Sequence, residues 1–155
     1  MCWACDNPGA SRREYLDHVE GVVTKAGWAV QAVEADRLRP PMAYTVGLTS
    51  HGRPELLVTG MAVRRALDLL NSVACHALHA TAPVHGERIP LRGGPVIEIV
   101  ELRQPAVHLC TAVELYGAEV RGIQLVHADD RGHWPWDRGY RGGRGGQPVL
   151  GPRAP

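Results

Sequence analysis

The sequence of 155 residues contains no phenylalanine, few aromatic residues of any kind (5%) and one lysine among 17 basic residues. Its net charge of +1 gives no electrostatic argument for binding nucleic acid or a membrane surface. Arginine usage of this kind, beside abundant Ala, Gly, Val and Pro, is typical of GC-rich, and in particular bacterial, genomes. The arginine excess is therefore not taken as evidence for phosphate binding.

Long apolar runs are also missing: none approaches the 18 residues of a membrane span. The N-terminal residues MCWACDNPG have neither a basic region nor an apolar core, so we expect no secretory signal and a cytoplasmic location. Thiols stay mostly reduced in that compartment. The four cysteines are accordingly interpreted as metal, redox or core residues rather than as a disulfide framework.

Hydrophobic patterning predicts two principal helices. The first begins at Ser11, which has the capping-box spacing to Glu14, and ends at Gly27. The second covers residues 62–80 and has one broad apolar face. Strands are predicted over residues 28–33, 42–48, 55–60, 96–102 and 120–127, whereas residues 107–116 fit either a helix or a strand.

The segment TSHGRP between residues 42–48 and 55–60 predicts a hairpin, because its Gly and Pro favour a turn. We therefore predict an α+β fold: a mainly antiparallel sheet with the two principal helices packed on one face. Residues 1–10 form an N-terminal CxxC segment, residues 11–140 a single α+β domain, and residues 141–155 a flexible Gly/Arg/Pro tail.

Two blocks carry a resemblance to a known family: AYTVGLTSHGRPELLVTG (residues 43–60) and QLVHADDRGHWPWD (residues 124–137). With the LLN of residues 69–71 between them, they resemble the bacterial family catalogued as domain of unknown function 4262. The opening MCWACDNPGA, GWAVQAVEAD and the closing GGQPVLGP resemble its actinobacterial members. The resemblance implies a small α+β domain that usually stands alone. It implies no reaction and no catalytic residue.

A second likeness, of pattern alone, is to the split-barrel flavin reductases. They also have a strand, a Gly-Pro turn, an apolar strand and then a helix, as in GLTSHGRPELLVTG followed by residues 63–79. This likeness keeps open a flavin- or metal-dependent enzyme of split-barrel-like architecture, although zinc is the cofactor we favour over flavin.

Cys2 and Cys5 form a CxxC, a spacing that lets two thiolates bind one Zn²⁺. Cys75 and His79 are four residues apart on the second predicted helix and share a face, so they could supply the other two ligands. A redox dithiol and two incidental cysteines are the alternatives.

Polar residues in the predicted hairpin, Tyr44, Thr45 and Glu55, are candidate ligand-binding groups, because buried polar groups need partners. Glu55 could be a general base, or could instead pair with an arginine. The aromatic loop with Trp134, Trp136 and Asp137 is a candidate recognition surface, or a cover for the edge of the core.

From these residues we predict a ligand- or partner-binding domain with a possible structural zinc at the CxxC. The partner would be a small molecule or a protein, with no nucleic acid and no membrane expected. Neither the oligomeric state nor an enzymatic activity follows from the sequence.

Overall fold

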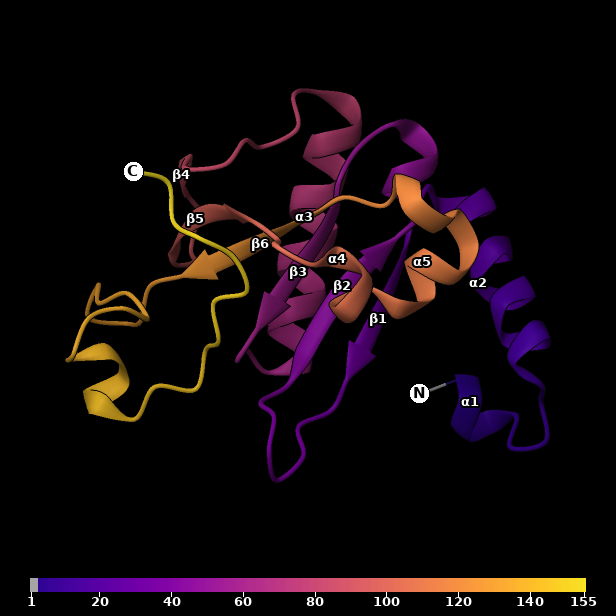
Figure 1. Ribbon diagram of the computed structural model, residues 1–155, viewed down its shortest axis with the longest axis horizontal. Helices are drawn as coiled ribbons and strands as arrows, with labels where there is room; N and C mark the ends of the chain where they lie inside the picture. Colours follow the sequence, from indigo (N-terminus) through magenta and orange to yellow (C-terminus); the bar gives the residue numbers. More distant parts are fainter. Residues whose placement is uncertain (1–2) are drawn as a thin grey trace.

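A six-stranded sheet runs through the centre of the computed structural model, which describes residues 3–155 (Figure 1). Its spatial order is β1-β2-β3-β6-β5-β4, and β3 and β6 pair in parallel while the other neighbours are antiparallel. The mainly antiparallel α+β fold is therefore confirmed. The strands are β1 (Ala29–Val33), β2 (Met42–Val46), β3 (Glu55–Thr59), β4 (Arg88–Pro90), β5 (Val96–Glu101) and β6 (Gly122–His127).

Helices cover both faces of this sheet, so the prediction of helices on a single face is wrong. The long helix α3 packs on one face, where Leu70 joins a core with Leu56 of β3. Helices α2 and α5 pack on the other face, around Leu57. Adjacent residues of β3 are thus buried on opposite sides, which its nearly continuous apolar sequence allows. The helices are α1 (Trp3–Asp6), α2 (Arg12–Ala26), α3 (Val63–His79), α4 (Pro105–His108) and α5 (Cys110–Tyr116).

The capping signals of α2 are confirmed. The Ser11 hydroxyl accepts from the Glu14 N–H, and the Glu14 carboxylate accepts from the Ser11 N–H. Gly27 ends the helix in the left-handed conformation (φ 92°), which costs glycine little because it has no Cβ. The predicted hairpin is also present, with a short 3₁₀ helix, η1 (Leu48–His51), between β2 and β3.

Two segments and the shape of the sheet differ from the prediction or complete it. The ambiguous residues 107–116 are helical, in α4 and α5. The stretch between α3 and β5, for which no strand is predicted, contains β4, a short edge strand that ends in proline, as edge strands tolerate. The sheet is open, with β1 and β4 at its edges, so it does not have the closed form of a split barrel.

The predicted flexible tail is instead built into the fold. The amide of Gln124, on β6, donates to the carbonyl of Pro148 (2.7 Å) and accepts from the N–H of Leu150 (2.8 Å). A Cβ at Gly151 would lie 1.9 Å from the carbonyl oxygen of Glu101, so backbone and backbone are in direct contact there. In Figure 1 this yellow segment runs back beside β6 and β5, where it covers part of the face that α2 and α5 leave open. Within residues 3–155, no helix is long and apolar enough to cross a membrane.

Candidate functional site

Glu55 and Thr45, two predicted ligand-binding residues, are fully buried and are used by the fold. The Glu55 carboxylate accepts five hydrogen bonds, including those from the N–H groups of Gly47 (2.9 Å) and Thr49 (2.9 Å) and from the hydroxyl of Thr45 (2.7 Å). It therefore holds the turn between β2 and β3. Its partners are neutral donors, so neither the general-base hypothesis nor the arginine-pair hypothesis describes this arrangement.

Tyr44 points to the opposite side of β2, into the core beneath α5. Its hydroxyl accepts from the N–H of Thr111 at 3.2 Å, near the start of α5. Burial raises the pKa of the Tyr44 hydroxyl above its ordinary value. The side chain thus joins β2 to α5 and does not line the same space as Glu55.

The two tryptophans of the aromatic loop stack on each other, with ring centroids 5.3 Å apart and planes 5° from parallel. Arg88 lies over Trp134 (4.8 Å) and Arg153 over Trp136 (3.7 Å), in the geometry of cation–π contacts. Both arginines also pair with the buried carboxylate of Glu98. The loop is therefore packed against the chain's own cations.

The carboxylate of Glu98 is held charged by this pairing. Burial alone would raise its pKa, but hydrogen bonds from Arg153 and Arg88 lower the pKa below its ordinary value. Asp137, the remaining predicted residue of the loop, accepts from the N–H of Trp134 at 2.8 Å and so closes a local turn. Neither the pairing of Glu98 with the two arginines nor the turn closed by Asp137 requires a ligand.

The predicted zinc ligands are not brought together among the described residues. Cys5 lies on α1, two residues after Trp3, whose ring stacks on His18 of α2. Cys75 and His79 lie on α3 and are exposed. Within residues 3–155, no three His, Cys, Asp or Glu side chains are placed to hold a metal ion. Cys2 lies outside the described residues, so zinc at the CxxC stays a prediction.

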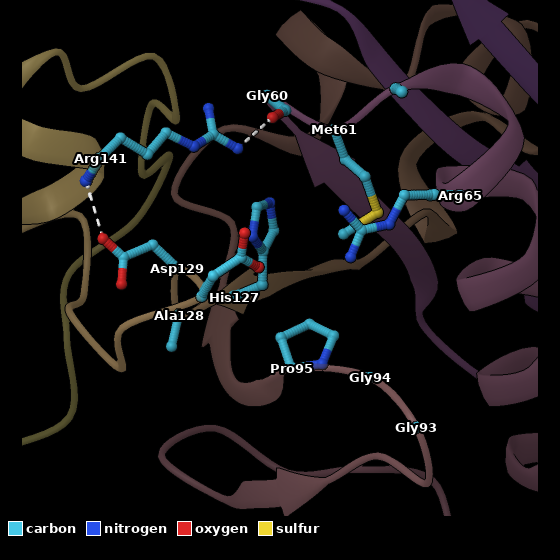
Figure 2. Close-up of a pocket in the computed structure, with 12 residues that line it drawn as sticks. Gly60, Met61, Arg65, Gly93, Gly94, Pro95, His127, Ala128, Asp129 and Arg141 are labelled. Atoms are coloured by element: carbon cyan, nitrogen blue, oxygen red, sulfur yellow. Dashed lines mark hydrogen bonds between the residues drawn. The ribbon is translucent and has the colours of Figure 1, made fainter.

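A cavity of about 470 Å³ opens where the parallel strands β3 and β6 both end (Figure 2). Its walls are the start of α3, the loop before β5, the residues after β6 and Arg141, and we refer to it as the α3 cavity. Its lining residues are Gly60, Met61, Ala62, Arg65, Gly93, Gly94, Pro95, His127, Ala128, Asp129, Asp130 and Arg141. A cavity of this size is in the range that holds small molecules and cofactors.

His127 forms part of the cavity wall and is 4% exposed. Its Nε2 lies 3.2 Å from the carbonyl oxygen of Thr59, and because a carbonyl can only accept, Nε2 carries the proton. Burial lowers the pKa of His127 below its ordinary value, and the charges of Arg141 and Arg65 lower it further. The imidazole is therefore neutral and lies in the positive field of two guanidinium groups.

Arg141 is held in an unusual backbone conformation: it is the one non-glycine residue of the described chain with a positive φ (49°). Its N–H donates to the Asp129 carboxylate at 2.8 Å, and its Nη2 donates to the carbonyl of Gly60 at 2.5 Å. Figure 2 shows this side chain reaching over the cavity toward the start of α3. Positive φ costs a non-glycine residue free energy and clusters at functional sites.

Asp129 organises the same wall. Its carboxylate accepts from the N–H groups of Arg131 (2.9 Å), His133 (2.8 Å) and Arg141 (2.8 Å). Although burial opposes ionisation, these hydrogen bonds lower the pKa of Asp129 to about 2. The charge of Asp129 is thus committed to the loop that carries Arg141.

Arg65 lies on the first turn of α3 and lines the cavity from the other side (Figure 2). Its guanidinium has no hydrogen bond or ion pair with any side chain or backbone group of residues 3–155. Arginine is abundant throughout the chain, so the sequence does little to single out Arg65 or Arg141. One sequence signal does point to the α3 cavity: Gly60 follows an apolar strand and precedes a helix.

The model of one protein family matches residues 22–141, and its description is domain of unknown function 4262. The chain belongs to this family. The match includes every residue that lines the α3 cavity and stops before the C-terminal segment that packs on the sheet. No curated protein and no solved structure matches the chain.

Proposed function

We propose that the protein binds a small molecule through an anionic group, a phosphate or a carboxylate, in the α3 cavity. The observation that carries the proposal is the approach of two guanidinium groups, Arg65 and Arg141, from different elements to one cavity. Guanidinium binds planar carboxylate and phosphate oxygens through two parallel N–H donors. An arginine without a partner in the described chain, such as Arg65, has these donors available for a ligand.

The backbone around the cavity supports the same chemistry. Within the described residues, no side chain caps α3 at Ala62, so the N–H groups of its first turn are open to a ligand. The positive end of a helix dipole favours an anion at that position. Gly93, which also lines the cavity, has no side chain to keep a ligand from the backbone, and a Cβ there would meet nothing within 4 Å.

Two aspartates also line the cavity, but their negative charges do not cancel the positive potential that the two arginines and the start of α3 create at its wall. The Asp129 carboxylate accepts hydrogen bonds from three backbone N–H groups, and Asp130 is exposed. The lowered pKa of His127, to which Arg141 and Arg65 contribute, supports a positive potential at the imidazole. The lining residues within the described chain include no Ser, Cys or Lys nucleophile, so we propose binding rather than covalent catalysis.

Thermal unfolding with sodium phosphate, compared with sodium chloride at equal ionic strength, tests this proposal. At ten times its dissociation constant a ligand adds about 1.4 kcal/mol to the free energy of unfolding. For a chain of this size, that raises Tm by roughly 3–6 °C. Arg65→Ala should abolish the rise. Arg64→Ala is the matched control, because Arg64 is an exposed neighbour on α3 that does not line the cavity.

A second variant, Arg141→Gly, removes the other guanidinium while leaving a residue that adopts a positive φ without strain. It should also lose the phosphate effect and yet remain folded. No phosphate effect in the unmodified protein, or an equal effect in all four proteins, would show that the cavity does not bind anions.

A further inference from the structure

A second cavity continues the α3 cavity along the helix. It has a volume of about 300 Å³ and is lined by Met61, Arg65, Asp68, Leu69, Ser72, Leu91, Arg92, Gly93, Gly94 and Pro95. Five of these residues, among them Arg65, line both cavities. The two spaces therefore form one groove between α3 and the loop before β5, with Arg65 at their junction.

Besides Arg65 and Arg92, the polar side chains that line this second cavity are Asp68 and Ser72, four residues apart on α3. That spacing puts them on one face of the helix, one turn from each other. Neither side chain has a hydrogen bond or ion pair with another group of the described chain. They therefore present a carboxylate acceptor and a hydroxyl, which can donate or accept, to the groove.

Apart from Arg92, the remaining walls are apolar, and they restrict which ligands fit the groove. Leu69, Leu91 and Met61 line the groove beside the polar pair. A purely apolar ligand would leave the Asp68 carboxylate desolvated without a partner, which is costly. A free inorganic anion would occupy the α3 cavity alone. A ligand with an anionic end and a hydroxyl-bearing body with apolar faces matches both the α3 cavity and the second cavity.

We infer that the ligand is a phosphorylated sugar or a nucleotide. Its phosphate lies between Arg65 and Arg141, and its sugar lies along α3 with hydroxyl groups on Asp68 and Ser72. The rise of an α-helix separates Arg65 from Asp68 by about 4.5 Å and from Ser72 by about 10 Å along its axis, which lets one sugar phosphate reach all three. This inference rests on the proposed anion site and names the class of molecule that enters it.

Isothermal titration calorimetry with four probes tests the inference: inorganic phosphate, ribose 5-phosphate, glucose 6-phosphate and adenosine 5′-monophosphate. At least one of the organic phosphates should bind ten-fold or more tightly than inorganic phosphate. Asp68→Asn and Ser72→Ala should each lower the affinity for that organic phosphate several-fold and leave the affinity for inorganic phosphate unchanged. Both positions are exposed on α3, so the variants keep the fold.

The outcomes separate the two proposals. If inorganic phosphate binds and no organic phosphate binds more tightly, the inference about the sugar is overturned and the anion site stands. The same conclusion follows if Asp68→Asn and Ser72→Ala leave every affinity unchanged. If none of the four probes binds, the anion site itself is overturned.

Discussion

The side chain of Gln147 forms hydrogen bonds with both backbone polar groups of His127. Its Oε1 accepts from the His127 N–H at 2.9 Å, and its Nε2 donates to the His127 carbonyl at 2.8 Å. The same Nε2 donates to the hydroxyl of Tyr140, next to Arg141. The C-terminal segment, which lies beyond the part of the chain matched by the family, therefore holds His127 of the α3 cavity and Tyr140, the chain neighbour of Arg141, in place.

Gln147→Ala should destabilise the protein strongly. The substitution leaves a buried N–H and a buried carbonyl of His127 without partners, and two such groups cost roughly 2–4 kcal/mol. Urea unfolding followed by circular dichroism measures the loss. Gln104→Ala, at an exposed position, is the control and should change the free energy of unfolding little. Equal stability of the two variants would mean that the segment is not part of the fold.

Glu55→Gln should destabilise the protein rather than impair binding. The amide keeps one acceptor oxygen and turns an NH₂ group toward the N–H donors of Gly47 and Thr49, so we expect a loss of roughly 2–4 kcal/mol. Urea unfolding beside Glu34→Gln, an exposed glutamate, gives the comparison. A Glu55→Gln protein of unchanged stability that fails to bind phosphate would instead make Glu55 a ligand-binding residue.

Gly60→Ala should cost more than Gly52→Ala, although both glycines have a positive φ (66° and 71°). A Cβ at Gly60 would lie 2.2 Å from the carbonyl oxygen of Gly146, whereas a Cβ at Gly52 meets nothing within 4 Å. Left-handed backbone alone costs about 1–2 kcal/mol at either site. Overpacking at Gly60 adds roughly 1–3 kcal/mol. Paired thermal unfolding curves measure the difference, and equal losses would contradict the contact with the C-terminal segment.

Stability should fall as the pH drops below about 6.5. Burial lowers the pKa of His127 in the folded protein, while the unfolded chain takes up a proton near the ordinary value of about 6.5. The unfolded state therefore binds more protons below that pH. The stabilisation is fully present above it and decreases by up to about 1.4 kcal/mol per pH unit as the pH falls.

Urea unfolding between pH 4.5 and 8 measures this slope. Asp129 does not affect the slope in this pH window. Its pKa is lowered to about 2, so the stabilisation it provides is lost only between about pH 4 and pH 2. His127→Gln should flatten the slope, and His79→Gln, at an exposed position of α3, should leave it unchanged. An unaltered slope in His127→Gln would assign it to other groups.

Local signals predicted the parts of this fold that depend on neighbouring residues. Ser11 and Glu14 lie three residues apart, so their capping box can be recognised from spacing alone. The apolar face of α3 repeats with the helical period, and it too was predicted correctly. The helix on the second face was not placed correctly, because nothing local shows on which side of a sheet a helix packs.

Contacts between distant residues explain what the sequence could not predict. Residues 141–155 are rich in Gly and Pro, which predicted a flexible tail, yet Gln147 and Gly151 are fixed by His127 and Glu101. The α3 cavity depends on the parallel pairing of β3 with β6, which brings Gly60 and His127 to the same end of the sheet. Before that pairing is known, Arg65 is an ordinary exposed arginine on a helix.

The most direct test of the account is a crystal structure of the protein with selenate, a tetrahedral oxyanion whose selenium is located by its anomalous signal. We predict a selenium peak in the α3 cavity, between the guanidinium groups of Arg65 and Arg141, and its loss in Arg65→Ala crystals grown in the same way. A cavity that holds no selenium at saturating selenate, with the arginines placed as described, would contradict the proposed anion site.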